Sequence, residues 1–283
     1  MQLKIIECPR DAMQGWKNII STEAKIEYIN QLLKVGFDTI DFGSFVSHEA
    51  VPQMADSKEV AAHLDMETSN SKLLAIIANV RGAKDAVALD NITYLGFPFS
   101  VSPTFQMRNT HSTIEDSLKT VQEIKNICDK NKKELVVYIS MAFGNPYGDE
   151  YNEDLVLKWI EELVNEGAKI ISLADTVGLA HPPQISSIVK KVISAFPGIE
   201  TGVHLHSTQH EWKEKIDAAL QSGCIRFDGA MKGFGGCPMA GDELVGNMDT
   251  NLMIPYFKEM GLLKNINKEA LLKAGEMATK IFV

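Results

Sequence analysis

Eight apolar runs of strand length alternate along this chain with segments of helical pattern, and this alternation limits the possible folds more than any other feature. Several of the runs are almost wholly apolar, as expected of parallel strands that are buried on both faces. Parallel neighbours need crossover connections, which are usually helices. The expected strands cover residues 3–8, 37–43, 73–79, 92–100, 134–143, 169–175, 202–206 and 225–233. The main expected helices between them cover 22–36, 113–130, 153–167, 182–196 and 211–223.

Eight such units predict a closed (β/α)8 TIM barrel rather than an open sheet, which need not stop at eight strands. The chain has 283 residues, and barrels of this kind commonly use about 250 residues as one domain. No Pro-, Gly- or Ser-rich linker divides it, so we expect residues 1–283 to form a single domain. The stretch after the last strand supplies an eighth helix at 251–261 and an additional C-terminal helix at 268–282.

Composition excludes several classes of protein. A formal net charge of −9 argues against nucleic-acid binding, which needs a basic face. The sequence has no apolar stretch of about 18 residues, so we expect no membrane association through a spanning helix. The N-terminus lacks the apolar region of a signal peptide, and the four cysteines follow no metal-finger spacing. We therefore expect a cytoplasmic protein with reduced thiols.

Polar residues recur where the expected strands end. Active sites of TIM barrels lie at the carboxyl ends of the strands, so these residues are the first candidates for chemistry. Arg10 and Asp11 are expected to end the first strand, Asp41 the second and Asp175 the sixth, and His204 and His206 are expected to end the seventh.

The strongest local pattern is His204-Leu205-His206. Residues i and i+2 of a strand point to the same side, so both imidazoles can face the barrel interior. There they could share one divalent metal with a carboxylate such as Asp11. Two core histidines that hydrogen-bond and bind no metal are the alternative. With one hard carboxylate and no thiolate, Mg²⁺ or Mn²⁺ fits this set better than structural Zn²⁺.

Neighbouring residues on a strand point apart, so Arg10 and Asp11 are expected to have different tasks. Asp11 could bind metal while Arg10 binds an anionic oxygen with its fork of donors. A structural salt bridge at the end of the strand is the alternative for this pair. As single carboxylates, Asp41 and Asp175 could be bases or hydrogen-bond acceptors, or could serve the fold alone.

A glycine-rich segment, GFGGCPMAGDELVGN, occupies residues 233–247 after the last strand. Three glycines within four residues, followed by Cys237 and a proline, would make a mobile lid with a thiol at its tip. An ordinary glycine loop with an inert cysteine is the alternative.

Taken together, these motifs resemble those of the 3-hydroxy-3-methylglutaryl-coenzyme A (HMG-CoA) lyases, which belong to a wider group of metal-dependent barrels. The resemblance covers almost the whole chain. The cysteine loop GGCP with its following Gly-Asn pair is the specific element, because condensing synthases of the wider group share only the RD and HxH elements. The similar segments are PRDAMQG (9–15), SFVSHEAVPQMADS (44–57), SLADTVG (172–178), HLH (204–206) and GFGGCPMA (233–240).

The resemblance implies a role for each candidate. Asp11, His204, His206 and Asn247 would bind Mg²⁺ or Mn²⁺. Arg10 would stabilise the enolate oxygen, Cys237 would act as the lid thiol in acid/base transfer, and His204 would also move protons. Asp175 would lie near the substrate hydroxyl, and Asp41 matches a family glutamate that positions the arginine.

The implied substrate is an acyl-coenzyme A, cleaved to acetyl-coenzyme A and acetoacetate, and the implied pathway is leucine degradation. Members of this family often pair as homodimers, so a homodimer is expected here.

The chain also departs from the family pattern. Ala12, Ser207 and Asn251 replace a glycine, an aspartate and a glutamate, Asp41 shortens a glutamate, and the loop before Asn247 has one extra residue. The metal-binding set survives these changes, whereas the acyl chain accepted is put in question. A lyase for a related 3-hydroxyacyl thioester, an aldolase or condensing synthase of the same group, and a non-catalytic binding barrel therefore remain alternatives.

Overall fold

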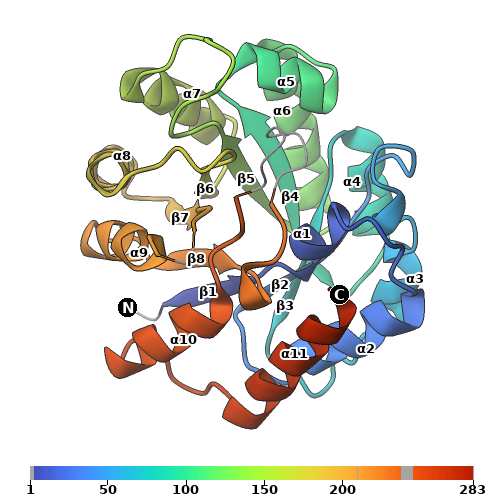
Figure 1. Ribbon diagram of the computed structural model, residues 1–283. Coiled ribbons are helices and arrows are strands. Elements are labelled where there is room, and N and C mark those ends of the chain that lie inside the picture. Colours follow the sequence, from blue (N-terminus) through green and yellow to red (C-terminus); the bar gives the residue numbers. More distant parts are fainter. Residues whose placement is uncertain (1–2, 209, 237–244, 283) are drawn as a thin grey trace.

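Eight parallel strands close into a barrel in the order β1 to β8, with β1 paired to β8. The computed structural model describes residues 3–208, 210–236 and 245–282 (Figure 1). The sequence-based prediction of a TIM barrel is thereby confirmed. The strands are β1 (Lys4–Glu7), β2 (Thr39–Ser44), β3 (Lys72–Ile76), β4 (Ile92–Ser100), β5 (Glu134–Ser140), β6 (Ile170–Ala174), β7 (Glu200–His204) and β8 (Arg226–Gly229).

Helices surround the barrel, and one helix follows each strand as a crossover or, after β8, as the closing element (Figure 1). These eight are α2 (Thr22–Leu33), α3 (Ser57–Ala62), α4 (Val80–Val87), α6 (Ile114–Lys130), α7 (Glu153–Asn165), α8 (Pro182–Ala195), α9 (Trp212–Gln221) and α10 (Thr250–Glu259). The expected additional C-terminal helix is α11 (Lys268–Ile281). Additional helices in the loops are α1 (Pro9–Gln14), α5 (Pro103–Thr110) and the single turns η1 (Pro52–Met54) and η2 (Met231–Gly233).

Two placements expected from the sequence are wrong. Strand β1 stops at Glu7, and Pro9 begins α1, so Arg10 and Asp11 lie in the first turn of a helix and do not end a strand. Proline suits a first helical position because its φ is already helical and its missing N–H would have no partner there. Strand β7 stops at His204, so His206 lies beyond the strand.

The main hydrophobic core lies between the barrel and the helices, and a smaller cluster of Leu74, Tyr94, Val136, Tyr138 and Ile170 fills part of the barrel interior. These interior residues come from alternate positions of β3 to β6, as the side-chain period of a strand requires. In the part of the chain that is described, no helix is long and apolar enough to cross a bilayer.

The C-terminal helix supports the loops at the carboxyl end of the barrel. Its last residue is followed by Phe282, whose ring lies 4.7 Å from that of Phe234 and 5.3 Å from that of Trp16, measured between centroids. Aromatic pairs at these separations are favourable beyond the area that they bury. Helix α11 therefore fixes the chain at the start of the glycine-rich loop, next to α1.

Candidate active site

Arg10 is held between two carboxylates at the carboxyl end of the barrel. Its Nε and Nη2 donate to Asp41 Oδ2 of β2 at 3.0 and 2.6 Å, and its Nη1 donates to Asp11 Oδ1 at 2.8 Å. All three side chains are buried. Since the guanidinium fork is planar and rigid, these bonds fix the direction in which Arg10 presents its charge.

Asp11 is an ionised carboxylate in this setting. Burial raises its pKa, but the charge of Arg10, together with the two histidines and a hydrogen bond from Asn247, lowers the pKa to about 2. The Asn247 Nδ2 donates to Asp11 Oδ2 at 2.7 Å, and the Gln14 side chain donates to Oδ1 at 2.8 Å.

The two histidine rings lie against each other, with centroids 5.1 Å apart and planes nearly perpendicular. The His206 Nδ1 is 2.7 Å from the backbone oxygen of Asp175. Because a carbonyl oxygen can only accept, Nδ1 carries the proton and Nε2 keeps its lone pair. Burial and the neighbouring His204 lower the pKa of His206, which favours this neutral ring.

Asn247 is fixed in front of the histidines by its backbone and its amide. It forms an isolated β-bridge with His206, and its Nδ2 donates to Phe234 O at 2.9 Å as well as to Asp11. Its Oδ1 and the His206 Nε2 are both buried, and neither has a hydrogen-bond partner among the described residues. Two buried acceptors without donors are costly, so each of them calls for a cation or another donor nearby.

The donor set fits a divalent metal. Ligand atoms of Asp11, His204 and His206 lie within 4.8 Å of one another, and all three residues are buried. Imidazole nitrogens, a carboxylate and an amide oxygen are ligands that Mg²⁺, Mn²⁺ and Zn²⁺ all accept. The unpartnered acceptors of His206 and Asn247 are the independent observation that supports this fit.

His204 ends β7 and contacts a residue that the sequence analysis missed. Its Nδ1 lies 3.2 Å from Oδ2 of Asp228 on β8. Burial lowers the pKa of His204, but the hydrogen bond and charge of Asp228 outweigh burial, so the pKa is raised overall. Asp228 is the single acidic residue in the expected strand 225–233, and this is the sequence signal that could have identified it.

Asp175 does not join this group through its carboxylate. The Asp175 Oδ1 accepts from the Ala180 N–H at 3.0 Å, and Oδ2 lies 3.3 Å from Lys215 Nζ. Lys215 also donates to the backbone oxygen of His206 at 2.8 Å. Asp175 therefore reaches the histidines through its backbone oxygen and through Lys215, a helix residue that no sequence pattern singled out.

The start of the glycine-rich loop passes directly over α1. Gly235 has φ +92°, and a Cβ there would lie 2.7 Å from both Ala12 Cα and Asp11 O. Only glycine meets both demands, the positive φ and the close approach. Cys237, the expected lid thiol, lies outside the described residues.

The VPQM segment has a structural task beside the site. Gln53 accepts from the Ile20 N–H at 2.9 Å and donates to Asn18 O at 3.0 Å, which ties down the loop after α1. Lys25 forms a buried ion pair with Asp56 at 2.8 Å and holds the other side of the same segment.

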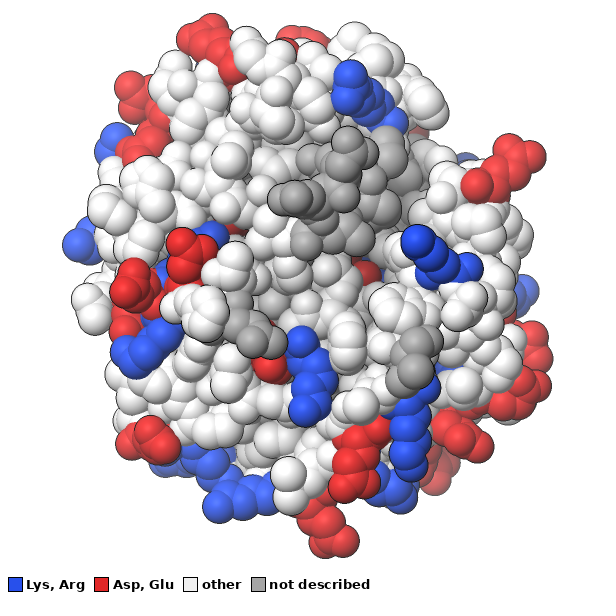
Figure 2. Space-filling model, in the orientation of Figure 1, with Lys and Arg blue, Asp and Glu red and all other residues white. Residues whose placement is uncertain are grey.

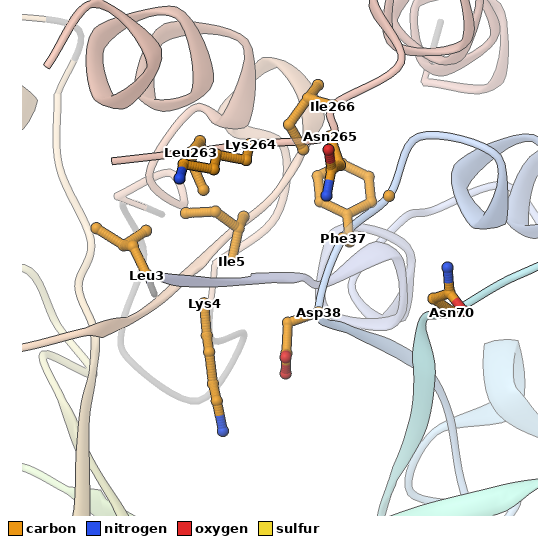
Figure 3. Close-up of a pocket in the computed structure, with 11 residues that line it drawn as sticks. Leu3, Lys4, Ile5, Phe37, Asp38, Asn70, Leu263, Lys264, Asn265 and Ile266 are labelled. Atoms are coloured by element: carbon orange, nitrogen blue, oxygen red, sulfur yellow. The ribbon is translucent and has the colours of Figure 1, made fainter. Parts of the chain in front are cut away.

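The surface around the site carries no dominant charge. Figure 2 shows Lys and Arg side chains standing singly around the face onto which Figure 1 looks, with acidic side chains among them. A separate pocket of about 270 Å³ lies at the amino ends of the strands, lined in part by Lys4, Asp38 and Lys264 (Figure 3). None of the metal-donor residues lines that pocket.

Known proteins resemble this chain over nearly its full length. The model of the HMGL-like family matches residues 2–278. A hydroxymethylglutaryl-CoA lyase of Bacillus subtilis is 31% identical over 95% of this chain and 89% of the relative. The cytoplasmic 3-hydroxy-3-methylglutaryl-CoA lyase of Rattus norvegicus is 32% identical over 98% of this chain and 80% of the relative.

Solved structures agree with this likeness. An HMG-CoA lyase from Acinetobacter baumannii, in complex with coenzyme A and 3-methylmalate, has a TM-score of 0.91 at 30% identity and covers 99% of this chain and 91% of its own. The carboxyl transferase domain of Rhizobium etli pyruvate carboxylase, with pyruvate, has a TM-score of 0.70 at 14% identity, which shows a shared fold alone.

Proposed function

The chain belongs to the HMGL-like family and is a carbon–carbon lyase of the HMG-CoA lyase type, and we propose that it cleaves HMG-CoA to acetyl-coenzyme A and acetoacetate with a bound divalent metal. One observation carries the metal part of this proposal. The unpartnered His206 Nε2 and Asn247 Oδ1 lie beside the ionised Asp11, and the fixed guanidinium of Arg10 borders the same group.

Asp11, His204, His206 and Asn247 would hold the metal. When bound, Mg²⁺ or Mn²⁺ supplies a charge that orients the substrate hydroxyl and carboxylate and lowers the pKa of the alcohol. Asp11 and Asp41 share a single guanidinium, that of Arg10, which leaves an excess of negative charge suited to a dication.

Arg10 would stabilise the charge that develops during cleavage. The bond between C2 and C3 of the substrate breaks as the hydroxyl loses its proton, and the bonding electrons move onto the thioester as an enolate. Donors aimed at such an oxygen are effective because they need no reorganisation when the charge appears. Asp41 would position the arginine, since it accepts from both Nε and Nη2.

His204 has two possible tasks that need the same nitrogen. An unprotonated Nε2 that faces the site can either bind metal or accept the hydroxyl proton. The donor group with Asp11 and His206 supports the first task. Asp175 would act as a positioning residue, because its backbone oxygen holds the Nδ1 proton of His206.

Cys237 would protonate the enolate carbon and so complete acetyl-coenzyme A, with the glycine-rich loop closing over the substrate. Cys237→Ser should therefore lower kcat far more than it raises KM. A large rise in KM with kcat preserved would remove the thiol from the mechanism.

The proposal also covers the location, assembly and pathway of the enzyme. Relatives carry names of both cytoplasmic and mitochondrial enzymes, and we propose a cytoplasmic, homodimeric, single-domain enzyme of leucine degradation here. A lyase for a related 3-hydroxyacyl thioester is the second candidate, favoured by Ser207 and Asn251, where the resembling family has acidic residues.

The test is release of acetyl-coenzyme A from HMG-CoA by the full chain, with Mg²⁺ or Mn²⁺ and again with a chelator. Metal-dependent release that Asp11→Ala abolishes is the expected result. If metal-loaded, folded protein released no acetyl-coenzyme A from HMG-CoA but cleaved a homologous 3-hydroxyacyl thioester, the second candidate would replace the first.

A further inference from the structure

Asp228 is a buried carboxylate with one hydrogen-bond partner. Its side chain is wholly buried on β8, and Oδ2 lies 3.2 Å from His204 Nδ1. Its Oδ1 has no partner among the described residues. Burying a carboxylate is costly unless other groups compensate for its charge, so such a residue rarely serves packing alone.

Arg226, a basic residue on the same strand, interacts with Asp228 through its charge but forms no ion pair with it among the described residues. Arg226 lies two residues earlier on β8, so both side chains point to the same side of the strand. Arg226 pairs with Glu200 at 3.1 Å, and its Nε and Nη2 have no partner among the described residues. The described residues show no ion pair between Arg226 and Asp228, although both are buried. Asp228 is therefore directed along the barrel toward His204.

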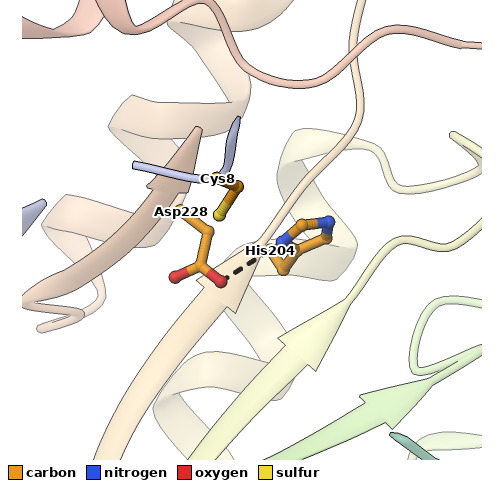
Figure 4. A group of neighbouring side chains, drawn as sticks. All are labelled: Cys8, His204 and Asp228. Carbon is orange, nitrogen blue, oxygen red and sulfur yellow. Dashed lines mark hydrogen bonds and ion pairs between the residues drawn. The ribbon is translucent and has the colours of Figure 1, made fainter. Parts of the chain in front are cut away.

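This contact decides which nitrogen His204 offers to the site. Figure 4 shows Nδ1 facing the Asp228 carboxylate and the second ring nitrogen on the opposite side of the ring. A carboxylate can only accept, so it keeps the proton on Nδ1 and leaves the lone pair on Nε2. His206 is held in the same way, but by a backbone oxygen, which no side-chain substitution can remove.

We propose that Asp228 is the positioning residue of His204, holding its Nδ1 proton so that Nε2 is presented to Asp11 and His206. The proposal deepens the function above, because it names what prepares His204 for either of its tasks. A metal-binding histidine is generally oriented by a partner of this kind, and loss of that partner costs about 10- to 100-fold in metal affinity.

Cys8 supplies both a rival interpretation and a control. Its Sγ, a His204 nitrogen and an Asp228 oxygen also lie within 4.8 Å of one another (Figure 4). If those three atoms bound a metal themselves, Nδ1 would be a ligand and would carry no proton. Cys8→Ala removes the thiol from this group and leaves the Asp228–His204 contact in place.

The direct test is the tautomer of His204, measured by nitrogen NMR on histidine-labelled full-length protein without metal, at a pH where the ring is neutral. The His204 signal is identified by its loss in His204→Gln. We expect the Nδ1–H form in the wild type and in Cys8→Ala, and a mixture in Asp228→Asn, because an amide can both donate and accept. An Nε2–H ring in the wild type would overturn the proposal. This result comes from the wild type alone, so it does not depend on whether an Asp228 variant folds.

A second measurement is Mn²⁺ affinity by titration calorimetry on proteins whose unfolding transitions show that they are folded. Asp228→Asn should bind Mn²⁺ about 10- to 100-fold more weakly than the wild type, and Cys8→Ala should bind it equally well. Equal affinity in Asp228→Asn, or an equal loss in Cys8→Ala, would contradict the proposal. Absence of Mn²⁺ binding in the wild type would instead contradict the proposed function, while the tautomer still decides the role of Asp228.

Discussion

Both ends of the barrel bury charged side chains, but the buried polar atoms that lack a hydrogen-bond partner differ between the two ends. At the amino end, Glu200 lies between two cations, with Lys4 Nζ at 2.6 Å and Arg226 Nη1 at 3.1 Å. In this charge cluster, the buried atoms without a partner among the described residues are Nε and Nη2 of Arg226, which are donors. At the carboxyl end, the buried acceptors without a partner among the described residues include His206 Nε2, Asn247 Oδ1 and Asp228 Oδ1.

This difference distinguishes a buried charge cluster that stabilises the fold from one that can bind a metal ion. Open N–H donors cannot bind a cation, so the amino-end cluster serves to close the barrel. Open acceptors beside an ionised carboxylate can bind one. In TIM barrels the carboxyl end carries catalysis and the amino end carries stability, which agrees with this division.

The largest expected effect comes from Arg10→Lys at the carboxyl end. Lysine keeps the charge but lacks the fork that contacts Asp41 and Asp11 together. We expect kcat/KM for HMG-CoA to fall about 100- to 1,000-fold, the usual cost of losing one oxyanion donor. Steady-state kinetics check this, and the exposed Arg81→Lys serves as the matched control. Activity within a factor of two of the control would remove Arg10 from the reaction.

Glu200→Gln tests the amino end. It removes the carboxylate with which the fully buried Arg226 pairs, and because Glu200 itself is only partly buried, we expect a cost of about 1 to 3 kcal/mol. The free energy of unfolding in urea should fall by this amount while kcat stays unchanged at a temperature where the variant is folded. A loss of kcat with unchanged stability would reverse the roles assigned to the two ends.

Glu7 on β1 belongs to neither charge cluster and titrates in an unusual range. It accepts from the Met231 N–H at 2.8 Å and from the Thr250 hydroxyl at 2.7 Å, which ties β1 to η2 and α10. Complete burial raises its pKa to about 8, although both hydrogen bonds act in the opposite direction.

Glu7 should therefore make stability depend on pH. Because its pKa is higher in the folded state than its ordinary value of 4.5, its contribution is complete below that value and is lost as the pH rises through about 8. We expect a loss of about 2 kcal/mol between about pH 6 and pH 8. Glu7→Gln should remove this dependence, and urea unfolding at both pH values measures it. An unchanged slope in the variant would assign the dependence to other groups.

The smallest effect is expected on the helical surface. Lys119 and Asp116 form an exposed pair on α6 at 2.9 Å, where water screens the interaction. Lys119→Ala should leave both kcat and the unfolding midpoint unchanged. A measurable change in kcat or in the unfolding midpoint would mean that surface ion pairs also contribute to activity or stability, which we attribute to the two ends of the barrel.

Much of the fold could be predicted from sequence because parallel strands buried on both faces leave long apolar runs. The β5 run at 134–140 and the β6 run at 170–174 are of this kind. Helix α1 was missed because six residues are too few to show a helical period, even with Pro9 at its start. Strand-end reasoning still found Arg10 and Asp11, since the short helix stays at the carboxyl end of the barrel.

The site was harder to complete. Arg10, Asp11, His204 and His206 stand in recognisable local motifs, whereas Asn247 entered through a family resemblance. Asp228 and Lys215 act on the histidines from β8 and α9, and only the closed barrel brings them there. When a contact partner comes from another strand or helix, its distance along the sequence follows no fixed spacing, so no local motif identifies it.

The most direct test of the whole account is Mn²⁺ binding to the full chain, measured by titration calorimetry on the wild type, Asp11→Ala and Glu200→Gln. We expect one Mn²⁺ site in the wild type, its loss in Asp11→Ala, and its retention in Glu200→Gln despite the lower stability of that variant. Retention of full affinity in Asp11→Ala, or loss in Glu200→Gln alone, would contradict the assignment of metal chemistry to the carboxyl end of the barrel.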